Sequence, residues 1–240
     1  EKRNAVSYEM WKAVNDALTI LAEDDTLRVL ILSGAGGKSF VAGADISKFE
    51  SERASKEAVT EYNQMTKKVY DGVANFPKPT IAQIDGFCIG GGVGLAASCD
   101  MRYCGSVSQF AIPAARLGLG YEYEGVNRLI HLIGPAFTKE VFFTARRFSA
   151  AEMASMGFVN KVVEDNALAD YCLEVANMIA ANAPLTVAAT KFIANQCQLE
   201  ESEKDLETCA AKVMNCFESS DYIEGRKAFM EKRTPVFKGK

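Results

Sequence analysis

Residues 86 to 94 read Gly-Phe-Cys-Ile-Gly-Gly-Gly-Val-Gly, and the fold is decided by this stretch. Its five glycines follow a strand-like run, Thr80–Ile84, and the apolar residues Leu95–Ala97 predict the start of a helix. Because glycine has no side chain, the backbone N–H groups at such a helix start stay accessible at the positive end of the helix dipole. We therefore expect exposed amide donors in a turn between a strand and a helix.

Two phosphate-binding motifs are excluded because each lacks one required glycine. A P-loop that ends at Gly36–Ser39 would need glycine where Leu32 stands, and a GxGxxG fingerprint from Gly90 would need glycine at Leu95. Close packing of small residues explains one or two glycines, but not five. A second turn, Ala42–Asp45, adds further amides. Two amides that point at one carbonyl oxygen would make an oxyanion hole.

The first half of the chain alternates helices with strands, which indicates an α/β architecture. Ser7 predicts a helix N-cap, and Ser39–Asp45 is expected to lead out of the sheet. The expected strands are Val29–Leu32, Thr80–Ile84, Met101–Cys104 and Gln109–Ala111, and the expected helices include Lys56–Val73 and those begun by Ser149, Leu168, Pro184 and Leu206. From Glu124 onward the pattern is almost entirely helical. We expect a core over residues 1–145 and a helical region over 146–240, without a flexible linker.

Composition excludes several classes of protein. Of the 240 residues, 48% are hydrophobic and 24% are charged, which excludes a disordered, collagen-like or disulfide-stapled chain. No apolar run approaches the ~20 residues that a membrane-spanning helix needs. The net charge of −4 gives no basic field for a nucleic acid backbone. We therefore expect neither a membrane nor a nucleic acid partner.

Seven cysteines without a CxxC pair predict reduced thiols, and thus a cytoplasmic or matrix-like compartment. The sequence begins at Glu1, so a targeting peptide would lie outside it. The single histidine, His131, lies in an apolar helical pattern without metal-ligand spacing. We expect no metal site and no histidine-dependent nucleophile.

The C-terminal segment is basic. Residues 226–240 contain six lysines and arginines, with Glu231 as the one acid. They fit a solvated helix end, where cations suit the dipole, and they equally fit a contact for a polyanionic ligand or a neighbouring subunit. Composition leaves both readings open.

Five motifs together resemble the enoyl-CoA hydratase/isomerase (crotonase) family. They are Lys2–Val6, Ser39–Asp45, Gly86–Gly92, Cys99–Asp100 and Ala228–Arg233, and they follow the family's order and spacing across nearly the whole chain. The resemblance implies a ββα spiral core, a C-terminal helical trimerisation region, and a homotrimer or a hexamer built as a dimer of trimers. It also implies an acyl-CoA substrate, with no cofactor beyond its CoA moiety.

The resemblance further implies that the N–H groups of Ala44 and Gly91 bind the thioester oxygen. The residues that it assigns to CoA are Lys2, Arg3, Ala42, Asp45, Ile46, Phe229 and Lys232, the last two often from a neighbouring subunit. From the residues alone, Asp45 and Asp100 are better explained as braces of the turns that carry the amides, and Asp85 as a residue that shapes its own turn.

The chain departs from the family's hydratases at two positions. The resemblance assigns their two glutamates to positions 94 and 114, where this chain has Gly94 and Ala114. Hydration needs one group to activate water and another to manage the proton at the α-carbon. We therefore do not expect hydration by the usual residues.

The segment that follows Gly118 offers other acids and phenols. The resemblance places Glu122 at the position of the catalytic acid in the family's isomerases. One carboxylate suffices to move a proton between two carbons. Tyr121 and Tyr123 are alternative hydrogen-bond donors, and Glu124 is a second candidate acid. Both acids also have a non-catalytic explanation. Glu122 would then point to solvent, and Glu124 would lie in the first turn of a helix, where a carboxylate suits the helix dipole.

We expect an enzyme that stabilises an enolate and moves the double bond of an enoyl-CoA, with Glu122 as the acid/base. Hydration by non-standard residues, decarboxylation and thioester hydrolysis remain alternatives, because all of them use the same stabilised oxygen. A non-catalytic acyl-CoA-binding protein is the alternative from another class.

Overall fold

Two four-stranded sheets form the body of the protein, in a computed structural model that describes residues 3–48 and 54–240. The first sheet has the order β1-β3-β5-β8 and is parallel throughout. The second has the order β2-β4-β6-β7, and its last pair is antiparallel. The strands are β1 (Leu30–Ser33), β2 (Ser39–Val41), β3 (Thr80–Ile84), β4 (Phe87–Ile89), β5 (Met101–Gly105), β6 (Gln109–Ala111), β7 (Phe148–Ser149) and β8 (Lys161–Val163).

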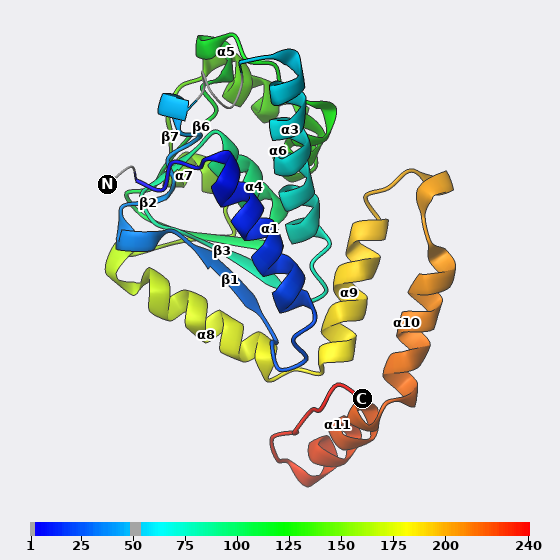
Figure 1. Cartoon of the computed structure of the whole chain (residues 1–240). Coiled ribbons are helices and arrows are strands. Elements are labelled where there is room, and N and C mark those ends of the chain that lie inside the picture. The colour runs from blue at the N-terminus through cyan, green and yellow to red at the C-terminus, as the bar shows by residue number, and fades with distance from the viewer. Residues whose placement is uncertain (1–2, 49–53) are drawn as a thin grey trace.

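From β1 to β6, successive strands alternate between the two sheets, so that each turn of the chain adds one strand to each sheet before a helix follows; β7 then joins the second sheet beside β6, and β8 completes the first. The predicted α/β class is confirmed by this repeating arrangement (Figure 1). The helices are α1 (Tyr8–Ala22), α3 (Lys56–Ala74), α4 (Gly91–Ser98), α5 (Ala114–Leu117), α6 (Tyr123–Thr144), α7 (Ala150–Ser155), α8 (Leu168–Ala180), α9 (Pro184–Gln196), α10 (Leu206–Glu218) and α11 (Ser220–Glu231). Gly134, with φ of 72°, breaks α6 just before Pro135.

Local sequence explains where these helices begin. The Ser7 side chain accepts a hydrogen bond from the Met10 N–H at the start of α1, whose Trp11 and Leu18 face the core. Ser149 and Glu152 form the predicted capping box of α7. These elements were predictable because a cap and an apolar spacing lie within a few residues of each other.

The main hydrophobic core lies between the sheets and the helices α1, α3, α4 and α6. A second cluster joins Ile81 and Tyr103 to α8, which packs against β3 and β5. All seven cysteines are free, and four of them (Cys88, Cys99, Cys104 and Cys172) are buried as small apolar residues. His131 is exposed.

Four short strands correct the expectations from sequence. Ser39–Val41 is itself a strand, and Phe87–Ile89 pairs with it inside the glycine-rich stretch, so that α4 begins at Gly91 rather than near Leu95. In the half expected to be helical, β7 and β8 complete the two sheets. Strands of two or three residues carry no usable period, because pairing with neighbours distant in the sequence defines them.

The last three helices project from this body as an arm (Figure 1). Its first helix, α9, is tied to the body by Lys191, whose largely buried Nζ lies 2.8 Å from Oδ2 of Asp100 and donates to the Lys78 carbonyl. Asp100 also accepts hydrogen bonds from the N–H and the hydroxyl of Thr80, so it braces the start of β3 rather than an amide-bearing turn.

Among residues 3–48 and 54–240, no single helix is both long and apolar enough to cross a membrane. Residues 165–180 and 184–196 reach that length and composition only as a pair, across a bend of 106°.

Candidate active site

A cavity of about 850 Å³ lies where α3, α4, α5 and the start of α6 meet. Its apolar wall includes Trp11, Val59, Tyr62, Ile112, Leu117, Leu119 and Leu129. Its polar groups are Asn63, Thr66, Lys67, Tyr70, Asp71, Tyr121, Glu122, Glu124 and Arg128. The backbone of Gly43, Ala44, Gly90 and Gly91 closes another side. This combination of an apolar cleft and a few converging polar groups is typical of small-molecule sites.

The N–H of Ala44 is turned away from its neighbouring chain segment. Val6 bridges Ala44 in parallel, and the bridge uses the carbonyl of Gly43 and the N–H of Asp45. Because neighbouring residues alternate direction in such a bridge, the N–H of Ala44 points to the opposite side. Within the described part of the chain, no hydrogen bond occupies this N–H. Ala44 itself lines the cavity.

The N–H of Gly91 is open for a different reason. Gly91 is the first residue of α4, and the first N–H groups of a helix have no partner within the helix. The chain enters α4 through Gly90, whose φ of 55° and ψ of −114° suit glycine alone. A Cβ placed on Gly90 would lie 3.9 Å from the Cα of Gly43, so the two amide-bearing segments run side by side.

Gly94 and Ala114, the positions that the resemblance assigns to hydratase glutamates, both line this cavity. Gly94 lies in the second turn of α4, and Ala114 is the first residue of α5, after Pro113. Neither has a titratable group, so chemistry on a bound acyl group would depend on the acids of α3 and α6.

Glu122 is the N-cap residue of α6 and lines the cavity. Its side chain makes no capping hydrogen bond and instead accepts one from Nδ2 of Asn63, at 3.2 Å. Glu124 lies in the first turn of α6, where a carboxylate suits the helix dipole, and its Oε1 is 3.5 Å from Nζ of Lys67. Of the two acids, Glu122 is therefore the one without a cationic partner among the described residues.

A chain of ion pairs links α3 to α6 at the cavity wall. Lys67 lies 2.7 Å from Asp71, and Asp71 lies 3.2 Å from Arg128. The hydrogen bond to Asp71 is the main reason that the pKa of Lys67 is raised, so this lysine stays charged. Arg128 also donates to the Ser98 hydroxyl at the end of α4. The network holds α3, α4 and α6 around the cavity.

Tyr121 lines the cavity and packs edge-on against Phe142, with ring centroids 4.9 Å apart. Tyr123 is 76% exposed and is not part of the cavity wall. Of the two phenols singled out from the sequence, the structure brings Tyr121 to the site.

A smaller cavity, of about 290 Å³, adjoins the first and shares Ala42, Ile89 and Pro113 with it. Its wall carries three arginines, which are Arg3, Arg116 and Arg147. The guanidinium groups of Arg3 and Arg147 each lie 5.3 Å from the centroid of the Phe87 ring. A wall with three guanidinium groups suits a phosphorylated ligand.

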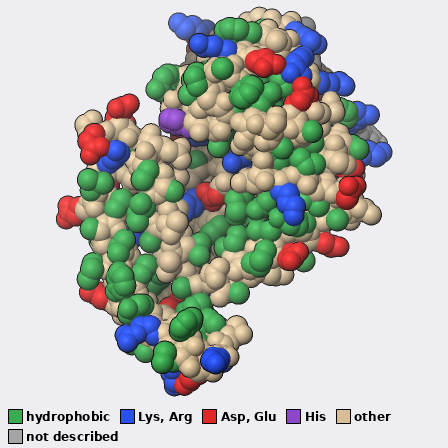
Figure 2. All heavy atoms as spheres, turned by 180° about the vertical axis from the view of Figure 1, so that it is seen from behind, with side chains coloured by type: hydrophobic (Ala, Val, Ile, Leu, Met, Phe, Trp, Pro, Cys, Tyr) green, Lys and Arg blue, Asp and Glu red, His purple; other side chains and the backbone are tan. Residues whose placement is uncertain are grey.

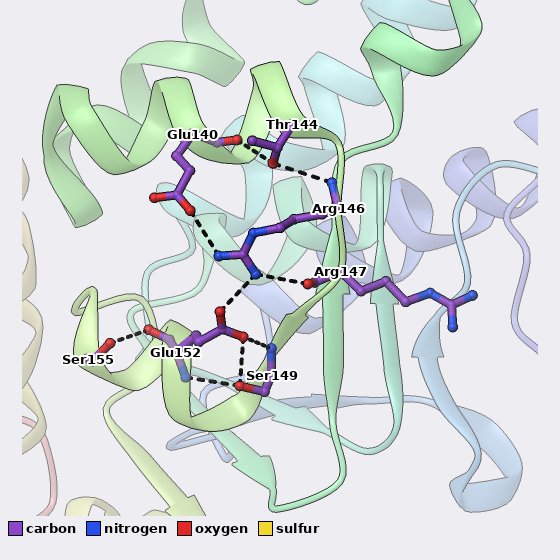
Figure 3. A network of polar contacts seen from close by, with 7 residues as sticks. All are labelled: Glu140, Thr144, Arg146, Arg147, Ser149, Glu152 and Ser155. Carbon is purple, nitrogen blue, oxygen red and sulfur yellow. Dashed lines mark hydrogen bonds and ion pairs between the residues drawn. The ribbon is translucent and has the colours of Figure 1, made fainter.

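A polar network fixes the turn that carries Arg147 (Figure 3). The neighbouring Arg146 binds Glu140 at 2.9 Å and Glu152 at 2.8 Å, and it donates to the Arg147 carbonyl. Hydrogen bonds from the Ser149 N–H and from Arg146 lower the pKa of Glu152 to about 2. Figure 3 shows the Arg147 side chain directed away from this network.

Three other residues predicted to bind CoA, which are Asp45, Phe229 and Lys232, line neither cavity. Asp45 is buried and accepts hydrogen bonds from the N–H and hydroxyl of Ser47, so it braces its turn. Ile46 begins the short 3-10 turn Ile46–Lys48, and its side chain lies outside the described part of the structure, as does Lys2 altogether. Phe229 and Lys232 are exposed on or just after α11, at the opposite end of the molecule from α5 (Figure 1).

No group of three histidine, cysteine, aspartate or glutamate side chains that could hold a metal ion is found within residues 3–48 and 54–240. Burial raises the pKa of Cys99, Cys104 and Cys172 to about 12, and that of Cys88 well above its usual range. These thiols stay protonated and are poor nucleophiles.

Sequence reasoning missed the contribution of α3 to the site. Val59, Asn63, Thr66 and Tyr70 line the cavity and recur at spacings of three or four residues. That spacing was visible in the sequence, but the stripe mixes apolar and polar residues, so it carries no hydrophobic signal.

Comparisons with known proteins agree with this architecture. A family model described as enoyl-CoA hydratase/isomerase matches residues 1–240. A crotonyl-CoA hydratase of Syntrophomonas wolfei is 35% identical over 98% of this chain and 89% of its own. A carnitinyl-CoA dehydratase of Salmonella paratyphi A is 35% identical over 100% of this chain and 92% of its own. The crystal structure of an enoyl-CoA hydratase/carnithine racemase from Magnetospirillum magneticum is 34% identical, with a TM-score of 0.93, over 100% of this chain and 89% of that one.

The two sheets, the helices between their strands and the terminal helical arm, together with these structural neighbours, therefore define an enzyme of the crotonase fold. The chain belongs to the enoyl-CoA hydratase/isomerase family, whose members act on CoA thioesters.

Proposed function

We propose that this enzyme moves the double bond of a 3-enoyl-CoA to the 2-position. The amides of Ala44 and Gly91 bind the thioester oxygen, and Glu122 transfers the proton. The observation that carries the proposal is that two unoccupied N–H groups and one carboxylate without a cationic partner among the described residues border a single cavity. The cavity's apolar wall suits an acyl chain.

The reaction needs only one acid/base group. The Glu122 carboxylate removes a proton from the α-carbon, and the electron pair of that C–H bond moves into a dienolate whose negative charge rests on the thioester oxygen. The two amides stabilise this charge by donating hydrogen bonds to the oxygen. The protonated Glu122 then returns the proton to the γ-carbon, so the double bond has moved and no co-reactant is consumed.

Hydration is the second candidate, and the names of the relatives favour it. It would require a water molecule and a second proton-transfer group. The cavity supplies Glu124 as a further carboxylate, but Glu124 is paired with Lys67. Decarboxylation and thioester hydrolysis would use the same two amides.

The smaller cavity is the proposed binding site for the nucleotide end of CoA. Arg3, Arg116 and Arg147 supply positive charge for its phosphates, and the Phe87 ring holds the guanidinium groups of Arg3 and Arg147 in place. The shared wall at Ala42 joins this cavity to the one that would receive the acyl group.

The arm supports assembly into a homotrimer, or into a hexamer of two trimers. Large hydrophobic side chains are exposed along it, as Figure 2 illustrates on one face of the molecule. They are Leu206, Val213, Met214 and Phe217 of α10 and Tyr222, Ile223, Phe229 and Met230 of α11. An exposed apolar surface of this kind marks a protein interface. In such an assembly, Phe229 and Lys232 would reach the CoA site of a neighbouring subunit. Free, buried cysteines support a reducing compartment, either cytoplasmic or matrix-like.

The proposal is tested by giving the wild-type enzyme two substrates of equal chain length. We expect 3-hexenoyl-CoA to be converted to 2-hexenoyl-CoA with a kcat/KM at least about tenfold above that for hydration of 2-hexenoyl-CoA, because one carboxylate suffices for the first reaction. Absorbance of the conjugated thioester follows both reactions, with opposite signs. Faster hydration than isomerisation would contradict the proposal, and binding without turnover of either substrate would favour a non-catalytic protein.

A further inference from the structure

The ring of Tyr70 occupies the space into which a side chain at position 94 would project. A Cβ built on Gly94 would lie 2.7 Å from Cζ of Tyr70 and 2.8 Å from its hydroxyl oxygen. Such contacts are too short for real atoms, so a side chain at position 94 would require the Tyr70 ring to move. Tyr70 lies on α3 and Gly94 on α4, two helices that pack together.

The Tyr70 hydroxyl also binds the residue that carries one of the two amides. It donates a hydrogen bond to the carbonyl of Gly91 at 2.9 Å. A Cβ on Gly91 would lie 3.1 Å from Cζ2 of Trp11 and 3.2 Å from the Tyr70 hydroxyl. Gly91 is thus enclosed by Tyr70 and Trp11, whose rings meet edge-on at 5.6 Å. A glycine has wide torsional freedom, and these contacts restrict it.

The phenol is held in the form that can donate this hydrogen bond. Burial, and to a smaller extent the nearby Tyr121 and Tyr62, raise the pKa of Tyr70 well above its usual value. The hydroxyl therefore keeps its proton over the whole working pH range and is not a general base. Its hydrogen bond to the Gly91 carbonyl gives it an influence on the reaction through Gly91.

We propose that Tyr70 is a positioning residue that holds the Gly91 amide in line with the thioester oxygen and fills the space left by the missing side chain at position 94. The inference rests on the proposed role of Gly91. It relates the glycine at position 94 to the tyrosine at position 70, because the tyrosine ring fills the space that a side chain at position 94 would use.

The test compares wild type with Tyr70→Phe, which removes the hydroxyl and keeps the ring. Tyr103→Phe is the matched control, because Tyr103 is a buried tyrosine of the second core cluster and does not line the cavity. The probe is crotonyl-CoA labelled with ¹³C at the carbonyl, and the readout is the shift of the thioester C=O stretch on binding, measured by infrared difference spectroscopy. This shift reports polarisation of the carbonyl whichever reaction follows.

We expect a shift to lower frequency in wild type and in Tyr103→Phe, and a clearly smaller shift in Tyr70→Phe. We also expect kcat for isomerisation of 3-hexenoyl-CoA to be about five- to tenfold lower in Tyr70→Phe, with KM nearly unchanged. This is the size of effect expected from the loss of one neutral hydrogen bond. Tyr70→Leu, which removes the ring together with the hydroxyl, is the second variant and is expected to reduce the shift at least as much. Equal shifts and equal kcat in wild type and Tyr70→Phe would overturn the inference and leave the proposed function intact. No shift in wild type itself would overturn the proposed function, and the inference with it.

Discussion

Replacing Ala44 by proline is expected to lower kcat about 10²- to 10³-fold, because proline has no N–H and one donor to the thioester oxygen is lost. The substitution leaves both hydrogen bonds of the neighbouring bridge in place, since these use the carbonyl of Gly43 and the N–H of Asp45. The measurement is the steady-state rate with 3-hexenoyl-CoA.

Ala44→Gly is the matched variant, because it removes the methyl group and keeps the N–H. Its kcat is expected to fall less than about tenfold, and circular dichroism and thermal unfolding show whether both variants are folded. A folded Ala44→Pro enzyme with a kcat within about threefold of wild type would exclude this amide from the reaction.

Glu122→Gln is expected to lower kcat for isomerisation about 10²- to 10⁴-fold, since an amide of the same shape cannot accept the α-proton. The hydrogen bond with Asn63 does not require a charge, so the glutamine can keep its place at the start of α6. KM should change little, because the substitution removes proton transfer and not the acyl-binding wall.

Glu124→Gln is the control for this second substitution. Glu124 stands two residues away and is paired with Lys67, so its loss is expected to reduce kcat less than about tenfold. Equal isomerisation rates in wild type and Glu122→Gln would rule out Glu122 as the acid/base. A larger loss for Glu124→Gln than for Glu122→Gln would transfer that role to Glu124.

The sequence predicted the elements whose signals are local. The strand Thr80–Ile84 and the capping box of Ser149 and Glu152 lie where they were expected, because each is specified within a few residues. The strand Phe87–Ile89 was hidden, since its neighbours on both sides are glycines. It is a strand because β2 and β6 pair with it, and pairing over such sequence distances leaves no local pattern.

The candidate site also has a part that the sequence predicts and a part that it does not. The amides of Ala44 and Gly91 were predicted from two glycine-rich turns and a family resemblance, and the structure brings both residues to one cavity. Tyr70 was not predicted, because its relation to Gly94 depends on how two helices pack. The arginines of the smaller cavity lie far apart in the sequence and are joined by the sheet and by the turn after α6.

A crystal structure of the enzyme with a bound enoyl-CoA would test most directly whether two backbone amides hold one carbonyl. We expect the thioester oxygen to lie about 2.7–3.1 Å from the nitrogens of both Ala44 and Gly91, with the acyl chain in the larger cavity. A thioester oxygen bound by neither nitrogen, or nitrogens directed into different cavities, would contradict the account.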